Sequence, residues 1–454
     1  MPDRCQFAAS NGLPQEQAAL LEALVDAIGS GPNPVDSLRA SEPLLTKLQR
    51  LQPQQPLLRP PEQSRHDALL KLQNWTQENF PQSQAGVLWE FSNKANSVCA
   101  KRHLDTGSVF ISIPKAMMLQ AAPGILQMNF FFTQIPSAAL TLQLLIETRK
   151  PSSTCNALFI SSLPYVGIDD LDSAWLWSFE DIQALLTGTS AFEKAIRTRL
   201  STIQHYVYIM GRIQLPKVLF GLSWVEWLWA SAIVLSRQNE SPDGTPFLVP
   251  CWDMCNDKHS GAESYFIQAE DRLVAECKHP IEPGSEIFIN YGQRSAAQLL
   301  VLQGYLHRNP ITPAKVQADL KTLGASSDGI EKLRAMLFDK RSLSSLPMTI
   351  APDGSISSPL RWAARIACLS RDDAAFLLRN PTAESVSEAN EERALVSLQA
   401  FMSLLLREIV AAQKRLDSLP TSHYFNRVAL AKSLVHTEME IFKVGLERLG
   451  KKAE

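Results

Sequence analysis

Cysteine, net charge and long hydrophobic runs are all scarce in this sequence. The 454 residues include only 7 cysteines, and the formal net charge is −2. Cysteines spread from Cys5 to Cys368 do not form a disulfide framework, so we expect a reducing compartment, the cytoplasm or alternatively the nucleus. A near-zero charge attracts neither nucleic acid nor an anionic membrane, so we expect neither as a partner. No apolar run reaches the roughly 20 residues of a spanning helix, and the N-terminal residues lack the apolar core of a signal peptide.

One cluster of metal-ligand residue types is also incomplete. Cys251, Cys255 and His259 are evenly spaced, but Trp252, Asp253 and Met254 intervene and no fourth ligand follows. Structural zinc sites take four protein ligands. The sequence therefore predicts no metal site here.

The first third of the chain combines helical spacing with a change to strand spacing. The chain is 45% hydrophobic, and its length favours two or three domains. Helices are expected over residues 14–27, 36–52 and 66–79, with Asp36 as the N-cap of the second and a Pro- and Gln-rich linker at 52–63. Short strands are then expected over 87–91, 97–100 and 109–114.

The remainder is mostly helical, with a second group of strands in the middle. Residues 124–236 have helical spacing and many tryptophans, which we assign to core packing: Trp175, Trp177, Trp224, Trp227 and Trp229. Strands are expected at 247–250, 263–268, 271–277 and 286–290, and shorter ones at 315–320 and 346–350. Residues 388–414 and 421–448 predict long amphipathic helices without sustained heptads, so a monomer is expected.

Two short polar clusters stand at the ends of apolar, strand-like runs. Asp253-Met254-Cys255-Asn256 follows one run, and Asn290-Tyr291-Gly292 follows another. An Asn after one strand and a Tyr after a later strand indicate a functional site more than packing. The stretch from Pro250 to Tyr305 is therefore the most informative part of the chain.

These residues resemble those of SET-domain protein methyltransferases of the Rubisco-methyltransferase type. Within that type the match is sharpest to the actin-histidine N-methyltransferases, over residues 236–239, 250–256 and 291–295. The resemblance implies an α+β fold, with a β-rich SET core split by a helical insert and followed by an all-helical substrate-binding domain. It assigns residues 1–84 to an N-terminal helical extension and linker, 85–305 to the SET domain with its insert at about 120–236, and 306–454 to the substrate-binding domain.

The resemblance also implies the reaction, the cofactor and the site residues. The reaction would be transfer of a methyl group from S-adenosylmethionine to a histidine of actin. Tyr291 would be the catalytic tyrosine, and Asn239 would orient the acceptor imidazole. Trp252 and Arg294 would join Asn239 in shaping the peptide groove. The cofactor would contact Arg65, Lys94, Ala95, Asn96, Arg237, Asp253, Met254, Cys255, Asn256, Asp257, Gln303, Gly304 and Tyr305.

The choice of acceptor follows from elementary acid–base chemistry. Deprotonating a lysine at pH 7 costs about 4.6 kcal/mol, because its pKa is near 10.4. An imidazole is already mostly neutral, so it needs orientation more than deprotonation. An asparagine amide such as that of Asn239 can hold one ring nitrogen by a hydrogen bond. The other interpretation of Asn239 is a helix-end cap.

The sequence departs from the family pattern at two places. No glycine lies between Gly86 and Gly107, and Lys94-Ala95-Asn96 occupies the stretch where the family has a glycine-rich cofactor loop. Asp257 stands where the family has histidine. Two alternatives therefore stay open: a lysine methyltransferase of the same fold, and a weakly active or inactive module that binds actin or another peptide.

Overall fold

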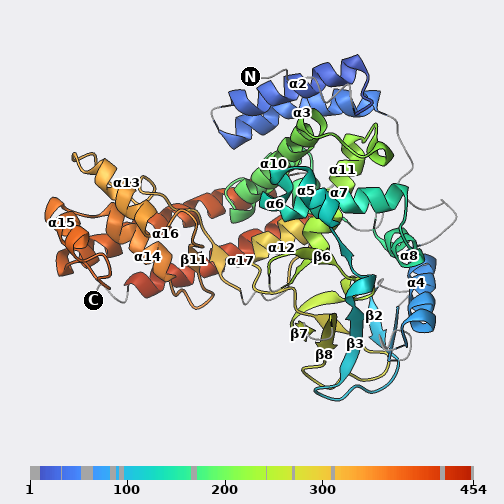
Figure 1. The fold of residues 1–454 in the computed structure, drawn as a ribbon. Helices are drawn as coiled ribbons and strands as arrows, with labels where there is room; N and C mark the ends of the chain where they lie inside the picture. Colours follow the sequence, from blue (N-terminus) through green and yellow to red (C-terminus); the bar gives the residue numbers. More distant parts are fainter. Residues whose placement is uncertain are drawn as a thin grey trace. The chain divides into compact units, whose positions relative to one another are not determined.

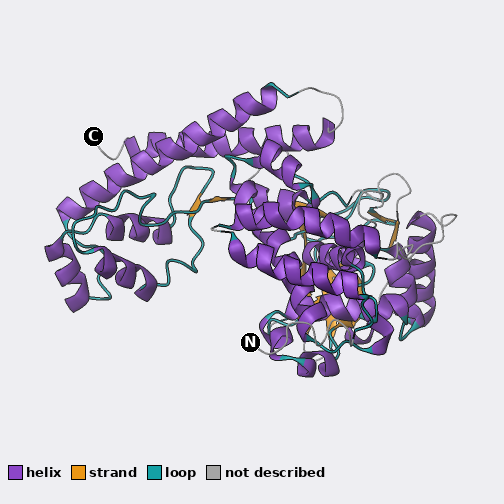
Figure 2. Cartoon of the chain, turned by 90° about the horizontal axis from the view of Figure 1, so that it is seen from above, coloured by secondary structure: helices purple, strands orange, loops and turns teal. Residues whose placement is uncertain are grey.

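The computed structural model describes residues 11–31, 33–52, 65–81, 88–91, 97–164, 171–241, 243–267, 271–307, 312–419 and 425–450. Helices predominate over strands (Figures 1 and 2). The α-helices are α2 (Gln15–Ser30), α3 (Pro34–Leu51), α4 (Arg65–Asn79), α5 (Pro123–Met128), α6 (Phe130–Gln134), α7 (Pro136–Arg149), α8 (Thr154–Ser162), α9 (Phe179–Leu186), α10 (Ser190–Arg212), α11 (Trp224–Arg237), α12 (Ala296–Gln303), α13 (Glu331–Lys340), α14 (Ser358–Ala367), α15 (Arg371–Arg379), α16 (Glu388–Asp417) and α17 (Phe425–Gly450). The strands are β1 (Trp89–Phe91), β2 (Val98–Ala100), β3 (Val109–Pro114), β4 (Leu119–Gln120), β5 (Asn239–Glu240), β6 (Pro246–Leu248), β7 (Asn256–Ile267), β8 (Arg272–Glu276), β9 (Phe288–Ile289), β10 (Ala314–Lys315) and β11 (Thr349–Ile350).

The chain divides into two compact units. The first contains Met1–Leu176 and Ile196–Gly292, and the second contains Trp177–Ala195 and Gln293–Glu454. The boundary falls inside α10, and the second unit takes up α9 from the middle of the sequence. This division differs from the three domains expected from the resemblance, because 177–195 packs with residues far along the chain. Those three domains stay a prediction.

The first unit contains the strands that hold the candidate site. A four-stranded sheet has the order β3-β8-β7-β9, and a three-stranded sheet has the order β4-β6-β5. In the larger sheet β7 is antiparallel to β8 but parallel to β9, with Asn256 opposite Phe288 and Asp257 opposite Ile289. The parallel pairing brings the beginning of β7 beside the residues that lead into Tyr291.

A helical core packs within the same unit. Helix α11 begins with a capping box, in which Ser223 accepts from the Glu226 backbone N–H and Glu226 accepts from that of Ser223. Helix α11 packs against α7, most of whose side chains are buried. All five tryptophans expected in cores are buried, so their assignment to packing is confirmed.

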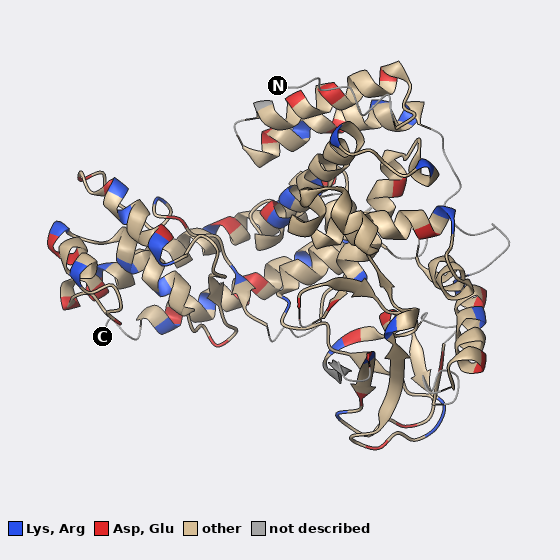
Figure 3. Cartoon of the chain, in the orientation of Figure 1, with Lys and Arg blue, Asp and Glu red and all other residues tan. Residues whose placement is uncertain are grey.

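The second unit is built on two long helices, α16 and α17, which lie side by side (Figures 1 and 2). Among the described residues, α16 is the one helix long and apolar enough to cross a membrane by length and composition alone. Its apolar side chains include Phe401, Met402 and Ile409, which are buried in the packed unit. Basic and acidic residues are both scattered over the helices of this unit (Figure 3).

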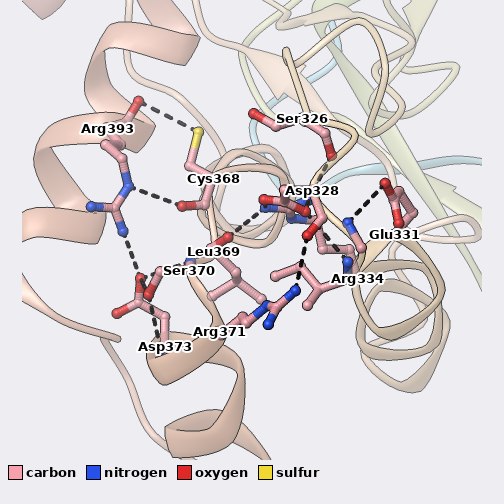
Figure 4. A network of polar contacts seen from close by, with 12 residues as sticks. Ser326, Asp328, Glu331, Arg334, Cys368, Leu369, Ser370, Arg371, Asp373 and Arg393 are labelled. Atoms are coloured by element: carbon pink, nitrogen blue, oxygen red, sulfur yellow. Dashed lines mark hydrogen bonds and ion pairs between the residues drawn. The ribbon is translucent and has the colours of Figure 1, made fainter.

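A polar network ties together loops and helices of the second unit (Figure 4). Arg334 is buried and donates to both carboxylate oxygens of Asp328, at 2.7 and 2.6 Å. It also donates to the carbonyl oxygens of Ser326 and Leu369. A buried guanidinium needs such partners, because desolvating an unpaired charge is costly.

Most predicted elements are present, with two differences of detail. The N-cap of α3 is Asn33, whose side chain accepts from the backbone N–H of Asp36, so the prediction of Asp36 as the cap was wrong. Asp36 instead lies in the first helical turn, where its negative charge interacts favourably with the helix dipole. The strands expected at 315–320 and 346–350 are reduced to the short antiparallel pair β10 and β11.

Candidate active site

Tyr291 is held at both its backbone and its hydroxyl. Its backbone N–H donates to Asp257 Oδ1 at 2.8 Å, and its hydroxyl donates to the carbonyl oxygen of Cys255 at 2.9 Å. Burial raises the pKa of the Tyr291 hydroxyl, and the nearby Arg237 only partly opposes this shift. The phenol is therefore neutral at physiological pH and keeps acceptor capacity on its oxygen.

A tight turn precedes the 3-10 helix that carries Trp252, Asp253 and Met254. Cys251 has φ 67° and ψ −48°, and Trp252 N–H donates to the Pro250 carbonyl at 2.8 Å. This is the positive-φ γ-turn, which is rare and strained for a residue with a side chain. Cys251 is completely buried, and its Sγ lies 3.8 Å from Thr76 Oγ1. The packed surroundings hold this strained conformation in place.

The side chain of Asn239, at the beginning of β5, meets that turn. Its Nδ2 donates to the carbonyl oxygen of Arg237 at 3.2 Å and to Asp253 Oδ1 at 3.3 Å. Its Oδ1 accepts from Trp252 Nε1 at 3.4 Å. The side chain of Trp252 is buried, and its ring centroid is 6.4 Å from that of Phe110. The structure thus brings together Asn239, Trp252 and Asp253, three residues that the sequence singled out.

Two arginines approach this cluster from different helices. Arg237, the last residue of α11, donates through Nη1 to the Asp253 carbonyl oxygen. Its buried Nε has no hydrogen-bond partner among the described residues. Arg65, the first residue of α4, donates to the Ser162 carbonyl at 3.0 Å and lies 3.6 Å from Met254 Sδ. An unused, buried guanidinium N–H suits an anionic group such as a carboxylate.

Asn256 and Asp257 open strand β7 and have different partners. Asn256 is exposed, and its Nδ2 donates to Glu286 Oε1 at 2.7 Å. Asp257 stands where the family pattern has histidine, and its carboxylate holds the Tyr291 backbone. This departure therefore has a structural consequence that the sequence did not indicate.

Other predicted residues lie in the second unit. Gly304 ends α12 in the left-handed conformation with φ 79°, and its N–H donates to Leu299 and Leu300 carbonyl oxygens. Both polar side-chain atoms of Gln303 are buried without a hydrogen-bond partner among the described residues. Arg294 and Tyr305 are partly buried within the same unit. Their predicted contacts with peptide or cofactor stay predictions.

The predicted cofactor loop Lys94, Ala95 and Asn96 lies outside the described residues. Asp253, Met254 and Cys255 are all buried, and their predicted contacts along a cofactor edge also stay predictions. Within the described parts of the chain, no group of three or more His, Cys, Asp or Glu side chains is placed to hold a metal ion.

Sequence reasoning assigned no role at this site to two of its residues. Glu286 holds the Asn256 amide, and Cys251 supplies the strained turn. For Glu286, the one signal in the sequence is its position shortly before β9. The positive φ of Cys251 has no sequence signal, because turns with this geometry normally use glycine.

Similar solved structures define the class of fold. The SET domain of LSMT bound to lysine and AdoHcy matches with a TM-score of 0.62 and 17% identity, covering 85% of this chain and 91% of that one. Rubisco LSMT bound to AdoMet matches with a TM-score of 0.60 and 16% identity, covering 85% and 92%. This chain therefore has the SET-domain methyltransferase fold, which confirms the predicted fold class.

Curated relatives extend the resemblance to particular proteins. The actin-histidine N-methyltransferase of Xenopus tropicalis is 24% identical over 376 residues, which span 76% of this chain and 63% of that protein. The human actin-histidine N-methyltransferase is 24% identical over 413 residues, spanning 84% and 68%. No family model matches the chain. The resemblance to this group of proteins, expected from the motifs, is confirmed.

Proposed function

We propose that this protein methylates a histidine side chain of actin, using S-adenosylmethionine. The single observation that carries the proposal is the amide of Asn239, fixed by Trp252 and Asp253 in the fold of a methyltransferase. The names of its relatives supply actin as the substrate, and the solved structures with AdoMet supply the cofactor. We also propose a cytoplasmic location, with the nucleus as the alternative, since the six described cysteines are unpaired.

The residues present suit the cofactor. The buried Nε of Arg237 lacks a partner among the described residues and could bind a carboxylate. Bound S-adenosylmethionine supplies an electrophilic methyl group on a sulfonium. No metal or acid–base cofactor is needed for the acceptor, because a neutral imidazole already has a nucleophilic lone pair.

The protein's own residues would position the acceptor. Asn239 Oδ1 accepts one hydrogen bond from Trp252 and has a second lone pair, which can accept an imidazole N–H. The other ring nitrogen then presents its lone pair. The neutral Tyr291 oxygen, held through its hydroxyl and backbone, would orient the reacting groups. The buried side chains of Trp252 and Asp253 limit water, which would compete for these hydrogen bonds.

The direct test is transfer of a labelled methyl group from S-adenosylmethionine to purified actin, followed by mass-spectrometric mapping of the modified residue. Tyr291→Phe should lower the rate sharply. Tyr208→Phe is a matched control, since Tyr208 is an exposed residue of α10. Label on an actin histidine that depends on Tyr291 supports the proposal.

The other outcomes point to the alternatives. Label on lysine would favour the lysine methyltransferase. Actin binding without any label, together with no heat of S-adenosylmethionine binding in calorimetry, would favour the inactive binding module and make Lys94-Ala95-Asn96 the first residues to examine.

A further inference from the structure

An asparagine amide is nearly symmetric in shape, so its hydrogen-bond partners decide which end faces a ligand. The NH2 end of Asn239 faces Asp253 Oδ1 and the Arg237 carbonyl, at 3.3 and 3.2 Å. Its carbonyl end faces the indole N–H of Trp252 at 3.4 Å. Both acceptors stand on one side and the donor on the other, so the surroundings select one of the two orientations.

The carboxylate of Asp253 is itself fixed from the backbone. Its Oδ2 accepts from the Val249 N–H at 3.1 Å, while the Asp253 N–H donates to the Val249 carbonyl at 3.1 Å. The residue is only 6% exposed. An ionised carboxylate can only accept hydrogen bonds, so above its pKa Asp253 can hold the NH2 end of Asn239 but not its carbonyl end.

The γ-turn at Cys251 explains why Asp253 and Trp252 meet Asn239 together. After the turn, Met254 N–H donates to the Cys251 carbonyl at 3.2 Å, and Cys255 N–H donates to the Trp252 carbonyl at 3.1 Å. These bonds close the 3-10 turn that carries both side chains. A strained turn that is buried and fully bonded provides a rigid support for the two groups.

We infer that Asp253 is a positioning residue, which fixes the Asn239 amide with its carbonyl oxygen turned toward the acceptor. This role differs from the cofactor contact expected from the sequence, and it rests on the proposed function. It specifies the acceptor further: the ring nitrogen that carries hydrogen faces Asn239, and the other nitrogen would receive the methyl group as the bond from that methyl to the sulfonium sulfur breaks. The methylated ring would then release its N–H proton to solvent.

The protonation state of Asp253 gives the inference a pH signature. Burial raises the pKa of its carboxyl to about 8, and the charged Arg237 opposes this shift. The other titratable groups that interact electrostatically with Asp253 are Cys251, Cys255 and Tyr291. Burial raises the pKa values of all three well above 8. Protonated Asp253 has an O–H donor and could also hold the carbonyl end of Asn239, so its discrimination is lost as the pH falls through about 8.

The test combines amide spectroscopy with kinetics. The protein is labelled with 15N-asparagine, the side-chain signals of Asn239 are assigned with Asn239→Ser, and spectra are recorded from about pH 6 to about pH 10. We expect the Asn239 signals to shift with a midpoint near 8 and to lose this shift in Asp253→Asn. Asp243→Asn is the control, because Asp243 lies in the exposed turn before β6.

Kinetic measurements use a histidine peptide of actin. Asp253→Asn should lower kcat roughly tenfold to a hundredfold, the scale of lost positioning, with little change in S-adenosylmethionine affinity. The pH–rate profile should lose its rise near 8 and keep the rise of the peptide imidazole. Asn239 signals that do not move with pH, or an Asp253→Asn variant with an unchanged profile, would overturn the inference.

The two arms separate this inference from the proposed function. Absence of methyl transfer by the unsubstituted protein counts against the function, whereas the amide titration needs no turnover and still decides the role of Asp253. If Asp253→Asn fails to fold, the titration of the unsubstituted protein alone decides it.

Discussion

The backbone N–H of Tyr291 donates to Asp257 Oδ1 at 2.8 Å, across the parallel pairing of β7 with the residues after β9. The same tyrosine donates from its hydroxyl to the Cys255 carbonyl at 2.9 Å. Both partners belong to one short segment at the beginning of β7. Tyr291 is thus anchored at its backbone and at its hydroxyl to the same short segment, and one of the two anchors, Asp257, departs from the family pattern.

Asp257→Ala should therefore impair catalysis more than folding. Losing the acceptor frees the Tyr291 backbone, and we expect kcat to fall roughly tenfold, since small displacements of a reacting group are costly. Asp257→Asn keeps a carbonyl acceptor and should recover most of the rate. Steady-state kinetics on a histidine peptide would check both variants. Equal rates for Asp257→Ala and the unsubstituted protein would disprove this role.

Asn239→Phe should shift the acceptor preference from histidine to lysine. The substitution removes the amide that Trp252 and Asp253 orient, and it leaves an apolar surface. We expect methylation of a histidine peptide to fall roughly a hundredfold and methylation of the matched lysine peptide to rise. Mass spectrometry of both peptides provides the measurement. If both activities were lost equally, the orienting role of Asn239 would be wrong.

Arg149→Ala should destabilise the first unit strongly. Arg149 donates to both carboxylate oxygens of Glu226, at 2.8 and 2.9 Å, and the two side chains are only 15% and 5% exposed. Removing the arginine leaves a buried carboxylate, which costs about 3–5 kcal/mol in the free energy of unfolding. Urea denaturation measures the loss.

The matched control is Arg39→Ala. Arg39 pairs with Asp36 at 3.2 Å, with side chains 55% and 37% exposed. Exposed pairs contribute about 0–1 kcal/mol, so this variant should be nearly as stable as the unsubstituted protein. Similar losses for the two variants would contradict the argument from burial.

Glu438 should make the second unit less stable as the pH rises. This buried residue of α17 accepts from the N–H and hydroxyl of Ser190, yet burial raises the pKa of its carboxyl to about 7. A carboxyl whose pKa is higher in the folded state than in the unfolded chain stabilises the fold while it is protonated. This stabilisation is complete below the unfolded pKa, near 4.5, and is lost as the pH rises through about 7.

Glu438→Gln removes this dependence. When the pH is raised from 4.5 to 8, the free energy of unfolding of the variant should increase by up to about 3 kcal/mol relative to that of the unsubstituted protein. The reason is that the native glutamate is ionised at pH 8. Denaturation at both pH values gives the difference. Glu440→Gln is the control, because Glu440 is exposed and pairs with Lys443. A pH dependence unchanged by Glu438→Gln would show that this carboxyl titrates normally.

Local patterns predicted most elements of the fold. The helices around 66–79 and 388–414 and the strand 109–114 lie close to their expected positions, because apolar periodicity of 3.6 or 2 reflects which face packs inward. Element ends were less accurate, as at the beginning of α3, where the cap is Asn33 and lies three residues before the predicted Asp36.

The sequence named the residues of the candidate site but not their contacts with one another. Asn239, Asp253 and Tyr291 were identified by their motifs, and the first two lie within hydrogen-bonding distance. The direction of the Asn239 amide and the anchoring of Tyr291 by Asp257 could not be read from the motifs, because both depend on atoms brought together from distant segments.

The elements and the kinds of residue proposed for the site follow from the chain's local patterns, since period, turn chemistry and motif are local properties of the chain. Three other features arise only in the folded protein: the parallel pairing of β7 with β9, the positive φ of Cys251 and the packing of α9 with α16 and α17. Each of these depends on contacts between residues far apart in the chain, and their free energies exist only once those segments are packed together.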